Sequence, residues 1–381
     1  MIKRGLFLIL FIVFFMGGNG CSNINQAREN SAPDENIALA WTVQTGGAIN
    51  QTPLIVGDTI IVTPSGAPLL ALDLETGEEL WRFAPAQGVW DRAFASDGKQ
   101  IFVGLKDKSI AALDASNGKL LWQKDLGINM QVPPLVNDGV LYAPTAFVGP
   151  ELKPDAHGRA KLFVLNAKTG EEFWVFQSDN YILQTPARNG GTLYLGGNFY
   201  DPAPIEEGGH TRIYALDLAT GSPRWTYESE DGFPKRLYAT GQALVFVGYQ
   251  DFMNGVDTET GELRWRYDTG NWTPSFLGAG DVVYFSSANT LVFALDSNTG
   301  EEIWQFNIPE GTFNYLLDAP VLLNEKLYFL TQQGDFFALD AANGELLWQA
   351  VTEISAARMG PVVWNGWLVI GDIEGKIYAY K

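Results

Sequence analysis

A nine-residue motif recurs along this chain, and it constrains the fold more than any other feature of the sequence. The motif reads Asp-x-x-(Thr/Asn)-Gly-x-x-x-Trp, and one of its seven copies begins with Asn instead of Asp. Successive copies are spaced by roughly 44 residues, a period typical of β-propellers, whose blades contain about 40–50 residues. The copies are Asp73–Trp81, Asp114–Trp122, Asn166–Trp174, Asp217–Trp225, Asp257–Trp265, Asp296–Trp304 and Asp340–Trp348.

Each period also contains the pattern of a four-stranded blade. Three short runs are rich in β-branched and aromatic residues, and a fourth contains the Trp. In the seventh period we predict strands over Ala319–Leu323, Lys326–Thr331, Asp335–Leu339 and Leu346–Val351. The motif predicts a hairpin between the third and fourth strands, because Gly adopts the positive φ of the turn and Asp accepts hydrogen bonds from its backbone N–H groups. The Trp then packs between neighbouring blades from the outer strand.

The two ends of the chain complete each other. Trp41 stands one period upstream of the first motif, and the chain ends at Lys381 within what looks like the start of another copy. Counting Trp41 gives eight blades. We therefore predict an all-β, eight-bladed β-propeller over residues 37–381. Its last blade takes three strands from Met359–Lys381 and its outer strand from Ile37–Gln44, which leaves no exposed sheet edge at the seam.

The residues before the propeller indicate export and tethering. A charged start precedes the apolar run Gly5–Met16, which is too short to span a bilayer and suits the core of a signal peptide over residues 1–20. Cys21 is the only cysteine of the chain, and the stretch resembles a bacterial lipoprotein signal, so we predict that Cys21 is lipidated. The alternative is an ordinary signal peptide with a stray Cys. The polar residues 21–36 are predicted to form a flexible tether.

The charge of the chain restricts its partners. It contains 44 acidic and 25 basic residues, for a net charge of −19. Nucleic acid is therefore not expected as a partner, because phosphate binding requires basic patches. Glutamate pairs such as Glu78-Glu79 and Glu301-Glu302 follow the hairpin Gly on a solvated edge. We interpret them as surface charge and not as paired catalytic carboxylates.

Two connections between second and third strands are unusually long, and they belong to the adjacent third and fourth blades. They span Phe147–Arg159 and Phe199–Thr211 and contain both histidines of the protein. Long loops on a rigid scaffold often carry binding sites, and apolar and aromatic anchors favour a protein partner. The candidate partner-binding residues are Phe147, Glu151, His157, Phe199, Tyr200, Ile205 and His210. The alternative is a pair of solvated loops, and no metal site is expected, because no short ligand spacing is present.

The mouth of the central channel is the second candidate site. Residues just before or at the start of the inner strands would surround it on the same side as the long loops. This set is polar and contains three arginines and one carboxylate, so it could hold an anionic or sugar-like ligand, with Trp90 or Trp272 as stacking surfaces. The alternative is a water-filled channel. The candidates are Gln51, Arg92, Gln131, Gln184, Arg236, Asp318 and Arg358.

The unit Ala-Leu-Asp-x-x-Thr-Gly-x-x-x-Trp, as at Ala71–Trp81, resembles the repeat of pyrroloquinoline-quinone (PQQ) type propellers. The resemblance covers Ile37–Lys381. It implies one of two branches. Quinoprotein alcohol dehydrogenases carry PQQ and a calcium ion in the funnel, under a disulfide between adjacent cysteines. The branch of the outer-membrane assembly lipoprotein BamB has the same eight-blade repeat, a lipidated N-terminal Cys and no cofactor.

The residues favour the second branch. The chain has no Cys beyond Cys21, its channel mouth offers little carboxylate besides Asp318, and dehydrogenase chains are much longer. We therefore expect a non-enzymatic, monomeric, lipid-anchored scaffold without PQQ. It would bind envelope proteins through its loops, including the outer-membrane barrel assembly machinery if the host has an outer membrane. The expected location is the periplasmic side of the outer membrane or the outer face of the cytoplasmic membrane.

Two alternatives stay open, because a fold does not fix a function. The first is a propeller that binds a carbohydrate or small ligand at the channel mouth. The second, with less support, is a relative of the PQQ-dependent dehydrogenases.

Overall fold

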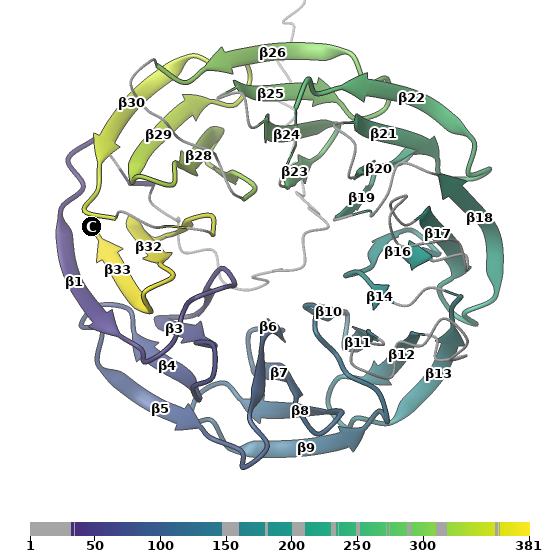
Figure 1. The fold of residues 1–381 in the computed structure, drawn as a ribbon, viewed down its shortest axis with the longest axis horizontal. Coiled ribbons are helices and arrows are strands. Elements are labelled where there is room, and N and C mark those ends of the chain that lie inside the picture. Colours follow the sequence, from purple (N-terminus) through teal and green to yellow (C-terminus); the bar gives the residue numbers. More distant parts are fainter. Residues whose placement is uncertain are drawn as a thin grey trace, which may run out of the picture.

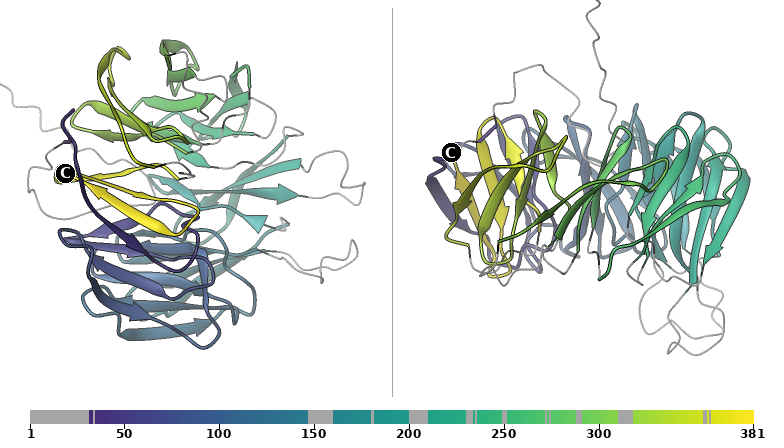
Figure 2. Two further views of the ribbon diagram at one scale, coloured as in Figure 1. Left: turned by 60° about the vertical axis from the view of Figure 1, so that its left-hand side comes forward. Right: turned by 90° about the horizontal axis from the view of Figure 1, so that it is seen from above.

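The protein is a ring of eight antiparallel β-sheets around a central opening (Figure 1). The computed structural model describes residues 32–33, 35–146, 160–179, 182–199, 210–229, 234, 236–248, 252–271, 273, 275–287, 291–309, 318–354, 357 and 359–381. Seen edge-on, the sheets stand next to one another in a disc (Figure 2). The predicted all-β, eight-bladed propeller is confirmed. The described residues form no helix, and so none that could cross a bilayer.

Within blades 1 to 7 the strands follow chain order from the channel outward. Blades 1 to 4 consist of β2 (Leu54–Val56), β3 (Thr59–Val62), β4 (Leu69–Asp73), β5 (Glu79–Phe83); β6 (Val89–Ser96), β7 (Gln100–Leu105), β8 (Ser109–Asp114), β9 (Leu120–Asp125); β10 (Leu135–Asn137), β11 (Val140–Pro144), β12 (Lys161–Asn166), β13 (Glu172–Gln177); and β14 (Ile182–Leu183), β15 (Ala187–Asn189), β16 (Thr192–Phe199), β17 (His210–Asp217), β18 (Pro223–Ser229). Blade 4 thus has a short fifth strand, because β14 and β15 both pair with β16.

Blades 5 to 8 repeat this arrangement. They consist of β19 (Leu237–Ala239), β20 (Ala243–Val247), β21 (Phe252–Asp257), β22 (Leu263–Asp268); β23 (Phe276–Ala279), β24 (Val282–Ser287), β25 (Leu291–Asp296), β26 (Glu302–Asn307); β27 (Val321–Leu323), β28 (Lys326–Leu330), β29 (Asp335–Asp340), β30 (Leu346–Val351); and β31 (Val362–Trp364), β32 (Trp367–Gly371), β33 (Lys376–Tyr380) with β1 (Leu39–Gln44). The strands of blade 7 match the prediction to within two residues. Its first strand begins after Pro320, which has no N–H to donate to a sheet.

Each motif forms the predicted hairpin, and the preceding blade holds it in place. Asp114 Oδ1 accepts the backbone N–H of Ser116 at 2.8 Å, and Gly118 has a φ of +70°. The indole of Trp81 lies so close to Gly118 that an added Cβ would stand 2.4 Å from its Cε3 atom. Trp81 Nε1 also donates to the carbonyl of Ala115 at 3.2 Å. The same ring-to-glycine contact recurs at Trp41–Gly77, Trp122–Gly170, Trp174–Gly221, Trp225–Gly261, Trp265–Gly300 and Trp304–Gly344.

These hairpins define the two sides of the ring. We call the side with the seven motif hairpins the hairpin face. The opposite side, with the connections between second and third strands and between blades, is the loop face. Because strands alternate in direction, both long connections and the entrances to the inner strands lie on the loop face.

The ring closes as predicted, through pairing of the two terminal strands. β1 is antiparallel to β33, with Trp41 opposite Ala379. Ala38 and Lys381 exchange both backbone hydrogen bonds, each at 3.0 Å. Figure 1 shows β1 as the outermost strand beside the C-terminus. The outer strand of blade 8 therefore comes from the start of the chain and its other three strands from the end.

The tryptophan of blade 7 lacks the usual partner, because no motif hairpin follows it in blade 8. Trp348 instead packs in a cluster with Ala32 and Ile37, from the segment that precedes β1. Pro33, within this segment, is buried. Contact with the propeller thus begins at least five residues before Ile37, while the domain limits at residues 20 and 36 stay predictions.

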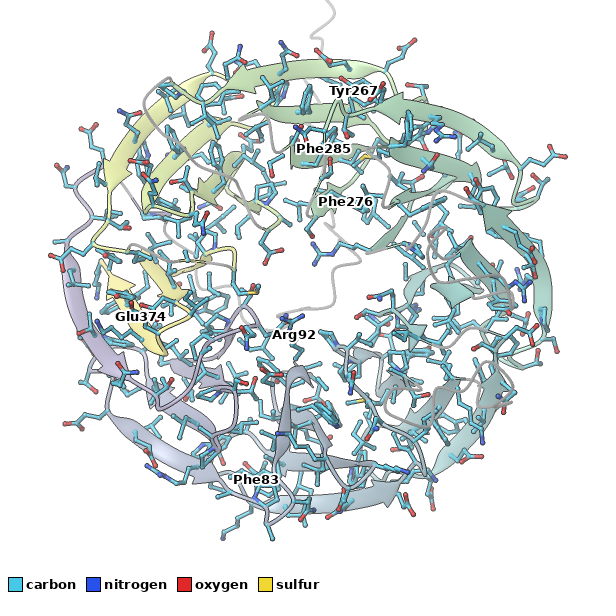
Figure 3. All side chains as sticks on the ribbon, in the orientation of Figure 1. Phe83, Arg92, Tyr267, Phe276, Phe285 and Glu374 are labelled. Atoms are coloured by element: carbon cyan, nitrogen blue, oxygen red, sulfur yellow. The ribbon has the colours of Figure 1, made fainter. Side chains whose placement is uncertain are left out.

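The hydrophobic core lies between the blades. One cluster joins blades 5 and 6 and includes Phe276 and Phe285, with Tyr267 packed against it. Figure 3 shows these three rings in a row from the channel to the outer rim. The centroids of Tyr267 and Phe285 are 6.2 Å apart, in an edge-to-face arrangement. Because each blade buries both faces against its neighbours, the scaffold that carries the loops is rigid.

Candidate functional site

Both long connections occur where the sequence predicts them, between β11 and β12 and between β16 and β17. Two of the candidate partner-binding residues lie in strands: Phe199 ends β16 and His210 begins β17, and the two are backbone partners at the last position of that ladder. The other candidates lie outside the described residues; they are Phe147, Glu151, His157, Tyr200 and Ile205. The structure therefore defines the bases from which the two connections leave the ring.

The bases of the two connections are joined through the backbone. Ala146, which follows β11, forms a β-bridge with Asn129 on one side and with Ile182 of blade 4 on the other. The N–H of Leu183 donates to the carbonyl of Thr145 at 3.1 Å. The extra strand β14 of blade 4 thus connects the start of the first long connection to the sheet that carries the second. The bases of the two connections are therefore joined by backbone hydrogen bonds between blades 3 and 4.

An arginine stabilises the base of the second connection. Arg212, two residues after His210, is 13% exposed at its side chain and pairs with Asp179 at 3.2 Å and with Glu228 at 2.8 Å. Asp179 follows the outer strand of blade 3, and Glu228 belongs to the outer strand of blade 4. Arg212 therefore links the two blades under the loop. The sequence gives no sign of this role, because an isolated arginine in a β-strand belongs to no motif.

At the channel mouth, a β-bulge in blade 2 changes the direction of the inner strand. The register of β6 with β7 jumps between Val89 and Phe94, which leaves Trp90, Asp91 and Arg92 outside the regular ladder. Asp91 accepts a hydrogen bond from Asn50 Nδ2 at 2.9 Å. Arg92 is exposed and has no ion pair among the described residues, and Figure 3 shows it at the edge of the central opening. Bulges of this kind often direct side chains into sites.

The carboxylate expected at the mouth, Asp318, connects three blades. Its Oδ2 atom accepts the N–H of Gly360 in blade 8 at 3.0 Å and the hydroxyl of Thr52 in blade 1 at 3.1 Å. Its Oδ1 atom accepts the N–H of Ala319 at 2.8 Å. The side chain therefore closes the seam at the channel, as β1 and β33 close it at the rim.

The other mouth candidates are mostly engaged or partly buried. Arg236 Nη1 donates to the carbonyl of Phe276 in blade 6 at 2.7 Å. Gln51, Gln131 and Gln184 are half-buried. Arg358 and Trp272 lie outside the described residues. Within the described part of the chain, no three His, Cys, Asp or Glu side chains are grouped as a metal site would require.

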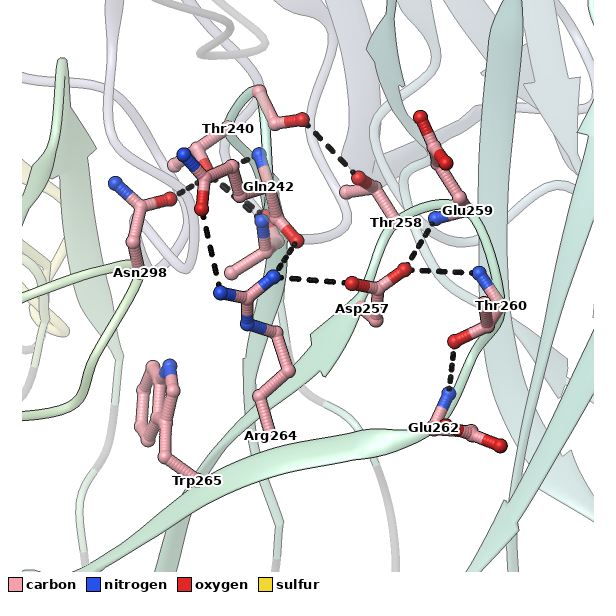
Figure 4. A network of polar contacts seen from close by, with 12 residues as sticks. Thr240, Gln242, Asp257, Thr258, Glu259, Thr260, Glu262, Arg264, Trp265 and Asn298 are labelled. Carbon is pink, nitrogen blue, oxygen red and sulfur yellow. Dashed lines mark hydrogen bonds and ion pairs between the residues drawn. The ribbon is translucent and has the colours of Figure 1, made fainter.

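On the hairpin face, the motif aspartates are fully used by their own turns. Figure 4 shows Asp257, which accepts the N–H groups of Glu259 at 2.9 Å and Thr260 at 3.0 Å, together with Arg264 at 3.0 Å. These hydrogen bonds lower the pKa of Asp257. The equivalent Arg224 contact lowers the pKa of Asp217 to about 2. Such carboxylates stay ionised and hydrogen-bonded, so they suit a structural role and not proton transfer.

Comparisons with known proteins agree with this geometry. The family model described as "Outer membrane protein assembly factor BamB" matches residues 34–88, 66–202 and 164–381. The outer membrane protein assembly factor BamB of Burkholderia pseudomallei is 24% identical over 95% of this chain and 94% of that protein. A crystal structure of BamB from Moraxella catarrhalis superposes with a TM-score of 0.63 at 18% identity, over 91% of this chain and 99% of that one.

Quinoprotein dehydrogenases also match, and their sequence alignments cover less than half of those enzymes. A quinoprotein ethanol dehydrogenase of Pseudomonas aeruginosa is 28% identical over 65% of this chain. The alignment covers 45% of that enzyme. Less than half of that enzyme's sequence therefore aligns with this chain.

Proposed function

The chain belongs to the family of the outer membrane protein assembly factor BamB, and from this premise we propose that it is a non-enzymatic scaffold for outer membrane protein assembly. The main support for the proposal is the extent of the sequence alignments. The alignment with the Burkholderia assembly factor covers 94% of that protein, whereas the alignment with the Pseudomonas dehydrogenase covers 45% of that enzyme.

The residues at the channel mouth do not fit the PQQ and calcium site of the dehydrogenase branch. Asp318 uses Oδ2 in two hydrogen bonds across the seam and Oδ1 in a hydrogen bond from the N–H of Ala319. The chain has a single Cys, so it cannot form the disulfide of adjacent cysteines that the resemblance implies for those enzymes. These two observations favour a binding role over quinone chemistry.

We place the partner site on the loop face of blades 3 and 4. The support is the rigid joint between the two bases through Ala146, Ile182 and Arg212. A joint of this kind fixes the bases of the two connections relative to each other, and a preorganised surface loses less entropy when a partner binds. The aromatic residues predicted there, such as Phe147 and Tyr200, suit a protein interface.

We further propose that the scaffold is exported and lipid-anchored through Cys21 at the cell envelope. The backbones of Ala38 and Lys381 are hydrogen-bonded at the position that corresponds to the motif hairpin in the other blades. The N-terminal segment therefore joins the ring at the hairpin face. A tether attached there leaves the loop face free for a partner protein of the outer-membrane assembly machinery.

The proposal is tested by shortening both connections. Residues 148–158 and 201–209 are each replaced by a two-residue Asn-Gly turn, which suits a β-hairpin. The variant and the wild type are crosslinked in cells and purified from solubilised envelope. We expect the wild type to retain a component of the assembly machinery and the variant to lose it. A control with Glu301→Ala and Glu302→Ala on the hairpin face should behave as wild type, and equal capture by all three proteins would contradict the proposal.

A second candidate function rests on Arg92. Its exposed guanidinium at the bulge of β6, which has no ion pair within the described part of the chain, could bind an anionic ligand in the channel mouth. Titration with PQQ, inorganic phosphate and maltose, followed by tryptophan fluorescence, tests this alternative. A response that Arg92→Gln abolishes would favour a ligand-binding propeller, whereas no response to any of the three probes would count against it.

A further inference from the structure

The outer strands of the eight blades differ in how their free edges are protected. An edge strand exposes unpaired N–H and C=O groups, and proteins commonly discourage pairing there with charged side chains. Six of the outer strands follow this rule, and they carry Glu79 and Arg82, Lys124 and Asp125, Glu172, Arg224 and Glu228, Arg264 and Asp268, and Glu302. Only β30 and β1 contain no charged residue, and they belong to neighbouring blades (Figure 1).

Of these two strands, β30 is the more apolar at its surface. Leu346 is 41% exposed, Leu347 is 43% exposed and Val351 is 81% exposed. Val351 stands three residues after the blade tryptophan, where other outer strands carry Asp125, Glu228 or Asp268. Val351 is the most exposed large apolar residue of the described chain, and the next is Phe173 at 55%. The exposed side chains of β1 at the matching positions are Ala40, Thr42 and Gln44, which offer little apolar surface.

Within the described part of the chain, the outer edge of β30 pairs with no other strand, and acidic residues stand at both of its ends. Among the described strands, β30 pairs with β29 alone. Glu345 directly precedes the strand and Glu353 follows it by two residues, and both are exposed. No basic residue occurs between Asp340 and Glu353. The strand is therefore an uncharged apolar edge between two negative ends.

We propose that β30 is a docking edge to which an extended segment of a partner protein adds as a further strand of blade 7. Added strands gain affinity from main-chain hydrogen bonds and specificity from alternate side chains. The complementary segment has apolar side chains beside Leu347 and Val351, where cross-strand pairs form, and basic residues next to Glu345 and Glu353. This proposal deepens the scaffold function proposed above and rests on it.

The charges at the two ends decide against other occupants. A second copy of this chain that paired with β30 in antiparallel fashion would bring Glu345 of one copy near Glu353 of the other. Parallel pairing would align each carboxylate with its own counterpart. Like charges opposite each other are unfavourable in either case. An anionic lipid surface is disfavoured for the same reason.

The test uses the full chain and a synthetic peptide in which Val and Thr alternate between two terminal lysines. Fluorescence anisotropy of the labelled peptide measures its affinity. We expect Val351→Lys to weaken binding at least about tenfold, because it places a positive charge on the apolar edge opposite a basic ligand. Asn307→Lys, at the equivalent exposed position of β26, is the matched control and should leave the affinity unchanged.

Two modified peptides complete the design. A peptide with N-methyl groups on alternate amides cannot form the strand ladder, and a peptide with terminal glutamates reverses the charges, so both should bind at least about tenfold more weakly. Equal effects of Val351→Lys and Asn307→Lys, or full binding of the N-methylated peptide, would overturn the proposal. Dimerisation of the wild type that Val351→Lys abolishes would also overturn it, in favour of a second copy as occupant. None of these results depends on the long connections, so a failure here is distinguishable from a failure of the loop-face scaffold.

Discussion

At the scale of single residues, the motif glycine meets two requirements at once. Gly118 adopts a φ of +70°, and it leaves room for the indole of Trp81 from the preceding blade. The turn alone explains the first requirement, and contact between blades explains the second. The repeated motif therefore reflects packing between neighbouring blades as well as local turn geometry, and it does not indicate a ligand.

The two requirements can be separated by substitution. Gly118→Ala should cost about 1–2 kcal/mol for a left-handed alanine and a further 1–3 kcal/mol for displacement of the Trp81 ring. Gly127→Ala is the matched control, because Gly127 has a φ of +69° and no atom within 4 Å of an added Cβ. It should cost only about 1–2 kcal/mol. Urea unfolding measures both, and equal losses would show that the contact with the indole contributes nothing.

The Arg224–Asp217 pair predicts a change in acid stability. The hydrogen bond from Arg224 lowers the pKa of Asp217 to about 2, below the value of about 3.9 for a free aspartate. A carboxylate with a lowered pKa stabilises the fold above its unfolded pKa, and this contribution is lost as the pH falls from about 3.9 towards 2. Arg224→Gln should raise the pKa of Asp217 and move acid unfolding to higher pH. NMR titration measures the pKa, and an unchanged value would contradict the assignment. Arg82→Gln, which removes the partner of Glu79, is the control and should leave the pKa of Asp217 unchanged.

At the scale of the element, the blade that closes the ring is held by contacts between residues that lie far apart in the sequence. The strands β1 and β33 pair at the rim, and Asp318 bridges blades 7, 8 and 1 at the channel. Ala32 and Trp348 pack against the same hydrophobic cluster. Three contacts between distant parts of the chain thus replace the one hairpin that blade 8 lacks. Opening of this seam would expose two sheet edges together.

Trp41→Ala tests the contribution of the seam. Trp41 packs its ring against Gly77 and donates Nε1 to the carbonyl of Leu74 at 3.1 Å, so it joins blade 8 to blade 1. Its removal should lower the free energy of unfolding by roughly 3–5 kcal/mol, the usual range for a large aromatic side chain. Truncation of Ile377–Lys381 should destabilise the domain further. Thermal unfolding at the wild-type temperature in both variants would argue against closure by the terminal strands.

At the scale of the whole molecule, the motif segments of the hairpin face carry a concentrated negative charge. The seven motif segments together contain sixteen acidic and four basic residues, so their net charge is −12 out of −19 for the chain. Because these segments form the hairpin face, that face should repel anionic lipid headgroups and acidic partners. The loop face and the edge of β30 are then the surfaces left for assembly partners, whether through side chains or through backbone pairing.

The sequence predicted the local and periodic parts of this molecule well. The eight tryptophans, the hairpin glycines and the strands of blade 7 follow from patterns within one period. The features it missed depend on contacts between distant residues. Thr52 and Asp318 are 266 residues apart along the chain, and no local pattern assigns that carboxylate to the seam. The bulge of β6, the extra strand β14 and the ion pairs of Arg212 likewise arise from neighbouring blades.

The central claim is that the loop face of blades 3 and 4 binds an assembly partner. The most direct measurement places a photo-reactive amino acid at Phe199 on the loop face, or at Lys168 in the blade 3 hairpin on the opposite face, and identifies what each crosslinks in living cells. The scaffold account predicts a crosslink from position 199 to a component of the outer-membrane assembly machinery, and none from position 168. A crosslink from position 168 alone, or no protein crosslink from position 199, would contradict it.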